Sequence, residues 1–312
     1  MGTFITQTIY GKNAQIAADN GTLEIQRLEN IFSANIETSE LSKINASAEN
    51  GATINVSPDF MNVLKKAKMV YDKSGGALDV TIGNPVSLWG IGTPNANVPK
   101  EIDIKNSLTH IGFDKLEIDE ENSRIKILDP KCRLDFGAIA KGYAADRVIE
   151  IYKSMGIQDA VLSVGGNAYA IGKNPSNKPF KIGIRNPDKD ENSIIGYINA
   201  SNLSVVTSGD YERFFMQDGV LYHHILDPKT GYPKNSGLRS VTITGTDSTT
   251  CDALSTAVFV LGKQKGQTLL SNFPDYGCVF IEENKHISIT DNLTDLFVFQ
   301  DESGEFSYDE KG

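Results

Sequence analysis

Apolar residues recur every three or four positions in three stretches of the chain, which is the pattern of an amphipathic helix. The first stretch predicts a helix over Pro58–Ser74 that ends at Gly75. A second helix is expected to follow Gly137 and to end at Gly156. A third is expected over Thr249–Leu261. Helices are therefore few, and the remaining pattern is mostly that of strands.

Alternating apolar and polar residues indicate strands in the rest of the chain. Lys115–Asp119 and Arg124–Leu128 read as a hairpin, and Ala77–Gly83 reads as a strand after the first helix. Further strands are expected at 160–164, 180–184, 193–198, 203–206, 240–244, 278–281 and 296–299. The fold class is α+β, with a mostly antiparallel sheet system and a few packed helices. Gly165-Gly166-Asn167 follows a strand but precedes no helical pattern, which excludes a dinucleotide-binding fingerprint.

Composition excludes some classes of protein. The 312 residues carry a net charge of -10, so the chain has no overall positive field to attract nucleic acid. Its three cysteines have no CxxC spacing and are expected to be buried thiols. Without a low-complexity linker or repeat, the chain is expected to form one domain over 1–312.

Two polar groups on the third helix are candidate metal ligands. Asp252 and Thr256 are four positions apart, so a carboxylate and a hydroxyl project from one helix face. Mg²⁺ prefers such oxygen ligands. The alternative is that Asp252, near the helix start, compensates the helix dipole or caps it.

Other candidate residues have similar alternatives. Lys141, close to the start of the second helix, could meet an anionic ligand or be an ordinary surface lysine. His223 and His224 could supply a general base, or one could be exposed and the other a core histidine. Trp89, the only tryptophan, reads as a core residue more readily than as a stacking platform.

Seven segments, taken in order, resemble the ApbE family of FAD:protein FMN transferases. The resemblance spans nearly the whole chain. The segments are Ser39 to Asn45, Leu78 to Gly83 with Leu88 to Gly90, Asp135 to Asp146, Val164 to Asn167, Ser208 to Tyr211, His224 to Pro228 with Thr230-Gly231, and Asp252 to Ala257.

The resemblance implies an ApbE-like, T-fold-like architecture, with two lobes and the active site between them. It implies that Mg²⁺ is held by Asp252, Thr256 and the backbone carbonyl of Ala138. The implied FAD contacts are Met1, Asn35, Ala77, Leu78, Asp79, Asp135, Ala138, Lys141, Gly165, Gly166, Asn167, Ser208 and His224. The implied catalytic residues are His224, Asp252 and Lys141.

The activity implied is Mg²⁺-dependent transfer of FMN from FAD to a threonine or serine hydroxyl of an acceptor protein, with release of AMP. Two alternatives stay open: a Mg²⁺-dependent FAD pyrophosphatase and a non-catalytic FAD-binding protein. Asn35 stands where many family members carry an aromatic residue, so bound FAD would be less shielded from water, which favours some hydrolysis.

The resemblance also implies a location and a partner. The acceptor would be an exported or membrane-bound protein of an electron-transfer system. The enzyme would be extracytoplasmic, either a membrane-anchored lipoprotein or periplasmic, with its export segment outside this sequence. The chain has no segment like the family's acceptor motif, so it is not expected to modify itself.

Overall fold

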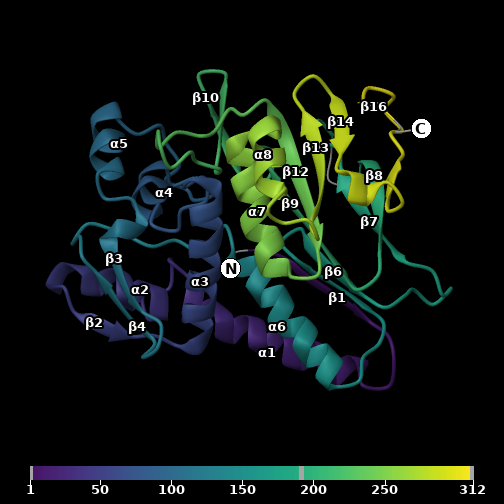
Figure 1. Cartoon of the computed structure of the whole chain (residues 1–312), viewed down its shortest axis with the longest axis horizontal. Coiled ribbons are helices and arrows are strands. Elements are labelled where there is room, and N and C mark those ends of the chain that lie inside the picture. Colours follow the sequence, from purple (N-terminus) through teal and green to yellow (C-terminus); the bar gives the residue numbers. More distant parts are fainter. Residues whose placement is uncertain (1–2, 190–192, 310–312) are drawn as a thin grey trace. The chain divides into compact units, whose positions relative to one another are not determined.

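The structure, a computed structural model, describes residues 3–189 and 193–309 (Figure 1). The predicted FAD contact Met1 lies outside the described residues. The chain divides into two compact units. Unit 1 comprises Arg27–Ala140 and Asp210–Asn235, and unit 2 comprises the stretch up to Gln26, Lys141–Gly209 and the chain from Ser236 onward. The prediction of one domain over 1–312 stays a prediction.

Unit 1 is mainly helical, with two small sheets. Its strands form a three-stranded antiparallel sheet in the order β2-β4-β3 and a separate hairpin of β10 and β11. The helices are α2 (Glu40–Ser47), α3 (Pro58–Ser74), α4 (Gly83–Trp89) and α5 (Glu101–Leu108), and the strands are β2 (Thr53–Asn55), β3 (Leu116–Asp119), β4 (Arg124–Ile127), β10 (Phe214–Gln217) and β11 (Val220–His223). Short 3₁₀ turns lie at Ala48–Asn50 and Phe113–Lys115. The long helix α1 (Ala14–Phe32) begins in unit 2 and ends in unit 1.

Trp89 is the centre of one part of the unit 1 core, as predicted. It is fully buried and its indole Nε1 donates a hydrogen bond of 2.7 Å to the carbonyl of Gly231. Its ring packs against Phe215 and Tyr222 of the β10–β11 hairpin. Since the ring is covered on all sides, Trp89 serves packing and cannot be a platform for a ligand ring.

Unit 2 is built on an eight-stranded sheet with the strand order β1-β5-β6-β9-β12-β13-β14-β16 (Figure 1). All its neighbouring pairs are antiparallel except β14 with β16. A second sheet has the order β15-β8-β7. The strands are β1 (Ile5–Ile9), β5 (Ala160–Val164), β6 (Asn167–Ile171), β7 (Phe180–Arg185), β8 (Ile194–Ala200), β9 (Leu203–Gly209), β12 (Leu238–Gly245), β13 (Gly277–Glu282), β14 (His286–Ile289), β15 (Phe297–Phe299) and β16 (Ser307–Tyr308). A 3₁₀ turn lies at Asp291–Leu293.

Three helices complete unit 2: α6 (Ala140–Ser154), α7 (Ser248–Leu261) and α8 (Lys263–Leu270). Helix α7 packs on the central strands β9 and β12 and is buried along almost its whole length. The polar groups of a helix covered in this way must be satisfied inside the unit, and α7 carries six polar residues: Ser248, Thr249, Thr250, Asp252, Ser255 and Thr256.

The strongest local signals in the sequence are confirmed. Helix α3 spans the predicted residues, with Ser57 accepting a hydrogen bond from the Phe60 amide as N-cap and Gly75 at φ 62° as the stop. The predicted α+β class with mostly antiparallel sheets is confirmed. The three cysteines are buried and free, as expected.

The strand expected over Ala77–Gly83 is wrong. The Asp79 carboxylate accepts hydrogen bonds from the Thr81 amide (2.8 Å) and hydroxyl (2.6 Å), which folds the segment into a turn. Gly83 then begins α4 instead of ending a strand. The second predicted helix also starts later than expected, at Ala140, because residues 137–139 form a turn.

Gly165 and Gly166 form the two-residue turn of the β5–β6 hairpin. Val164 pairs directly with Asn167, and the two glycines have φ values of 58° and 88°. Such a turn needs positive φ at both positions, which glycine adopts without strain. No helix among the described residues is both long and apolar enough to span a membrane.

Candidate functional site

The buried carboxylate of Asp252 lies beside the ammonium group of Lys141 in unit 2. Lys141 Nζ is 3.2 Å from Oδ1 and 3.5 Å from Oδ2, and the Gly142 amide donates a 2.9 Å hydrogen bond to Oδ2. The Asp252 side chain is 2% exposed and that of Lys141 is 24% exposed. The alternative of a free surface lysine is therefore wrong, since Lys141 neutralises a buried charge.

Asp252 does not cap α7. The N-cap is Asp247, whose Oδ1 accepts a 2.7 Å hydrogen bond from the Thr250 amide. Asp252 is the fifth residue of the helix, beyond the first turn where dipole compensation acts. A buried carboxylate with no capping duty is costly to keep, which is typical of a ligand-binding group.

Thr256 lies one turn after Asp252, next to strand β9. Its hydroxyl oxygen is 3.3 Å from that of Ser208, which in turn is 2.7 Å from that of Ser255. The Ser255 hydroxyl donates to the backbone carbonyl of Asp252 at 2.8 Å. The structure thus brings four predicted residues, Lys141, Ser208, Asp252 and Thr256, to one part of unit 2.

This donor set fits a hard cation. It offers one buried carboxylate and one half-buried hydroxyl on the same helix face, and the carboxylate already has a cationic neighbour in Lys141. Within residues 3–189 and 193–309, no three His, Cys, Asp or Glu side chains are grouped as a metal site. Mg²⁺ does not require such a group, because it retains waters and takes oxygens from phosphates. Ala138, the third predicted ligand, belongs to unit 1 and lies in the turn that precedes α6.

Asn167 has an unsatisfied buried amide. It is 1% exposed at the start of β6, and neither its Oδ1 nor its Nδ2 has a hydrogen-bond partner among the described residues. A buried amide without partners costs free energy, so such a group signals a missing ligand or water. Of the predicted FAD contacts, Asn167 is therefore the one with an independent structural indication.

The predicted unit 1 contacts Asp79 and Asp135 lie on segments that run side by side. The Asp135 amide donates a 2.8 Å hydrogen bond to the carbonyl of Val80. Burial raises the pKa of Asp79 above its ordinary value, against the opposing effect of the Thr81 hydrogen bonds. The Asp135 carboxylate accepts a hydrogen bond from the Gly137 amide, which shapes the turn that holds Ala138.

The two adjacent histidines have different environments. His223 is buried, its Nε2 donates to the Lys234 carbonyl, and its Nδ1 accepts from the Ile225 amide. Burial lowers the pKa of His223 to about 4, so the ring is neutral at pH 7. His223 is thus the core histidine of the pair.

His224 is partly exposed, and its ring is oriented by a backbone group. Its Nδ1 lies 3.2 Å from the carbonyl oxygen of Arg213. A carbonyl oxygen only accepts, so Nδ1 carries the proton and Nε2 carries the lone pair. His224 therefore has the tautomer that a general base acting through Nε2 requires.

The remaining predicted contacts in unit 1 have ordinary environments. Ala77 and Leu78 are buried, and their amides donate to the Ser74 hydroxyl at the end of α3. Asn35 is exposed in the segment after α1, where its amide donates to the Ser33 hydroxyl. Their predicted roles with FAD stay predictions.

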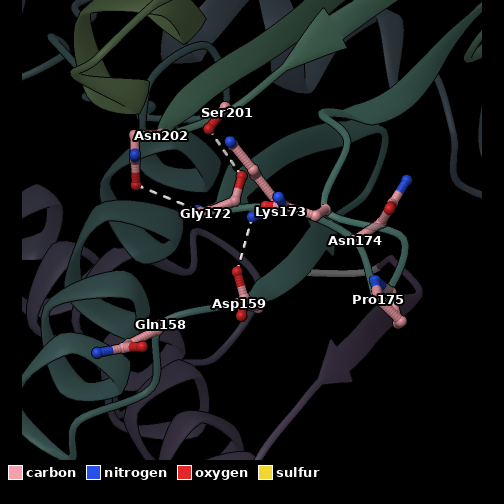
Figure 2. Close-up of a pocket in the computed structure, with 9 residues that line it drawn as sticks. Gln158, Asp159, Gly172, Lys173, Asn174, Pro175, Ser201 and Asn202 are labelled. Atoms are coloured by element: carbon pink, nitrogen blue, oxygen red, sulfur yellow. Dashed lines mark hydrogen bonds between the residues drawn. The ribbon is translucent and has the colours of Figure 1, made fainter.

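A polar hollow of about 520 Å³ lies elsewhere in unit 2, between the loops that follow α6, β6 and β8 (Figure 2). Its polar groups satisfy one another: Asp159 accepts from the Lys173 amide, Asn202 from the Gly172 amide, and the Gly172 carbonyl from Ser201. It contains none of the predicted site residues.

At the Asp252 site, sequence reasoning missed Gly142, whose amide donates to Asp252, and Asp146, whose carboxylate accepts from the Ser248 and Thr249 amides at the start of α7. Both were in a recognised segment, but neither had an assigned role. Their spacing of four positions on α6 is the signal that could have found them, because it places them on one helix face. Ser255, which supports Ser208, was missed in the same way.

Comparisons with known proteins show the family of the chain. The sequence model of the ApbE family matches residues 1–280. The "FAD:protein FMN transferase" of Treponema pallidum is 33% identical, with 95% of this chain and 86% of that protein covered. The protein of the same name from Klebsiella pneumoniae is 35% identical, with 93% and 89% covered.

Solved structures give the same result. The crystal structure of the ApbE protein of Thermotoga maritima matches with a TM-score of 0.83 and 34% identity, covering 92% of this chain and 93% of that one. The flavin transferase ApbE of Vibrio cholerae matches with a TM-score of 0.81 and 28% identity, covering 97% and 95%. The fold and these similarities define an enzyme that transfers flavin. The chain belongs to the ApbE family.

Proposed function

We propose that this enzyme transfers FMN from FAD to a threonine or serine hydroxyl of an acceptor protein. The hydroxyl oxygen attacks the phosphorus of the FMN half, and the bond from that phosphorus to the bridging oxygen of the pyrophosphate breaks. A phosphoester joins FMN to the acceptor, and AMP leaves with the bridging oxygen. The hydroxyl proton passes to a base.

The observation that carries the proposal is the buried Asp252 carboxylate, paired with Lys141 and lying one turn before the Thr256 hydroxyl. Asp252 and Thr256, with the Ala138 carbonyl, would hold Mg²⁺. When bound, this ion would neutralise phosphoryl oxygens and fix the line of attack. The fit of the donor set supports Mg²⁺ over softer metals, because it contains only oxygens.

The chain's own residues then have separate tasks. Lys141 can move from Asp252 toward a phosphate, where it would stabilise the charge that develops as AMP leaves. Asn167 would orient FAD through the amide that has no protein partner. His224 would take the acceptor's proton at Nε2, the nitrogen that bears the lone pair.

We also propose, from the resemblance, that the acceptor is an exported or membrane-bound electron-transfer protein. The enzyme would then act outside the cytoplasm, as a membrane-anchored lipoprotein or a periplasmic protein. Hydrolysis of FAD to FMN and AMP is the second candidate activity, and the exposure of Asn35 supports it, because that side chain offers FAD little cover from water.

The test is incubation of the whole chain with FAD and MgCl₂, with and without a purified electron-transfer domain that carries an acceptor threonine. AMP release and the mass of the domain are followed together. A mass gain of one FMN that disappears with EDTA, and with a threonine-to-valine domain, is the expected result. AMP and free FMN without labelled domain would favour the hydrolase, and intact FAD would leave a binding protein.

A further inference from the structure

Helices α6 and α7 approach each other closely at Gly142. A Cβ atom at this position would lie 2.2 Å from the Ser248 carbonyl oxygen and 2.7 Å from Asp252 Cβ. Only a residue without a side chain permits this approach. It allows the Gly142 amide to reach the Asp252 carboxylate at 2.9 Å.

Asp146, one turn further along α6, binds the first turn of α7. Its Oδ1 accepts from the Ser248 amide at 2.8 Å, and its Oδ2 accepts from the Thr249 amide at 2.8 Å and the Thr249 hydroxyl at 2.5 Å. These amides are at the positive end of α7, where a carboxylate is favourable. Burial, together with repulsion from Asp247, nevertheless raises the pKa of Asp146 to about 6.

The two contacts fix α7 on α6 at both ends of one helical turn. Asp146 holds Ser248 and Thr249, and Gly142 holds Asp252, which lies three positions after Thr249. A shift of the first turn of α7 would therefore move the Asp252 carboxylate away from Lys141 and the Gly142 amide. Because Asp146 accepts through both carboxylate oxygens, its contact resists both sliding and rotation of that turn.

We propose that Asp146 is a positioning residue for the cation site, which holds α7 against α6 so that Asp252 lies in the geometry that binds the ion. The proposal rests on the Mg²⁺ site of the proposed function. It gives Asp146 a role in ion affinity beyond its role in the stability of α7. Supports behind a metal ligand commonly affect ion affinity 10-fold to 100-fold.

Asp146→Asn tests this proposal, with Asp247→Ala as the matched control. Both variants remove carboxylate contacts from the α7 N-terminus, but only Asp146 joins it to α6. MgCl₂ is titrated against the whole chain with FAD, and the ion is followed by the rise in melting temperature and by AMP release. We expect Asp146→Asn to need about 10-fold to 100-fold more Mg²⁺ in both assays. Asp247→Ala should melt earlier and keep the wild-type Mg²⁺ requirement.

Thr249 provides a milder pair if Asp146→Asn fails to fold. Thr249→Val removes one of the three hydrogen bonds to Asp146, whereas Thr249→Ser retains it. We expect Thr249→Val to raise the Mg²⁺ requirement and Thr249→Ser to keep it at the wild-type value. The proposal would be overturned if Asp146→Asn required no more Mg²⁺ than the wild type. If Asp146→Asn does not fold, the same result for Thr249→Val would overturn it. If Mg²⁺ changed neither the melting temperature nor the AMP release of the wild type, the ion site of the proposed function would instead be refuted.

Discussion

Lys141 and Asp252 form an ion pair at 3.2 Å between residues 111 positions apart in the sequence. The pair joins α6 to α7, and in the proposed function it combines the two charges that phosphoryl transfer uses, an anionic ion ligand and a cationic phosphate ligand. Without a substrate each charge satisfies the other, which keeps the buried carboxylate compensated.

Asp252→Asn should abolish most transfer activity while leaving a folded protein. The amide keeps the shape and can still accept from Gly142, but the negative charge that attracts Mg²⁺ is lost. We expect kcat/KM for FAD to fall on the order of 100-fold or more, measured by AMP release at saturating MgCl₂. Asp247→Asn is the control, because asparagine is an equally good N-cap. Normal activity in Asp252→Asn would show that the ion is held elsewhere.

Lys141→Met should make stability depend on Mg²⁺. Without the ammonium group, Asp252 retains a buried charge compensated mainly by the Gly142 amide, and the free energy of unfolding should fall by about 1–3 kcal/mol. A cation bound to Asp252 would replace the missing charge. We therefore expect MgCl₂ to recover part of the loss in urea unfolding of Lys141→Met, and to do less for the wild type. Equal effects of Mg²⁺ on the two proteins would contradict this.

His223 should make the protein less stable as the pH falls. Its folded pKa of about 4 is below the ordinary value of 6.5, so between these two pH values the unfolded chain binds a proton at His223 and the folded protein does not. The stability it provides is complete above pH 6.5 and is lost as the pH falls toward 4, by about 2–3 kcal/mol. The pH dependence of the unfolding free energy in His223→Gln, compared with the wild type, isolates this contribution. Parallel curves between pH 4 and 7 would rule it out.

Gly142→Ala should destabilise the α6–α7 contact. The new Cβ would lie 2.2 Å from a backbone carbonyl oxygen, so the helices must separate, at a cost of about 3 kcal/mol or more. Gly21→Ala in α1 is the comparison, because the nearest atoms to its Cβ belong to side chains, which can shift more readily than a backbone carbonyl: Gln7 Oε1 at 2.8 Å, Val148 Cγ1 at 3.0 Å and Tyr152 Cε1 at 3.2 Å. Thermal unfolding should show a much larger loss for Gly142→Ala than for Gly21→Ala.

The elements predicted from the sequence are those with strong local signals. Helix α3 has a serine cap, a proline at its start and a glycine at its end, so its limits could be read from neighbouring residues. Helix α1 was missed because Gly21 interrupts its pattern, and that glycine makes room for Val148 and Tyr152 of α6. This helix therefore depends on packing against residues that are distant in the sequence, and a short stretch of sequence does not contain that information.

The candidate site likewise has features that local spacing predicts and features that depend on tertiary packing. The i and i+4 spacing of Asp252 and Thr256 could be read from the sequence, and the helix that carries them was confirmed. The ion pair with Lys141 could not be predicted from spacing, because it depends on how α6 meets α7. The strand expected at Ala77–Gly83 failed because one side chain, Asp79, competes for backbone amides and folds a turn instead.

The hydrogen bond from Thr249 to Asp146 spans 103 positions, and it has a consequence for the order of events during synthesis. Helix α6 and strands β5 to β12 must leave the ribosome before α7 exists to receive the Asp146 carboxylate. Contacts that close such long stretches of chain form late and fold slowly. Competence to bind the proposed ion should therefore be among the last properties that a newly made chain acquires.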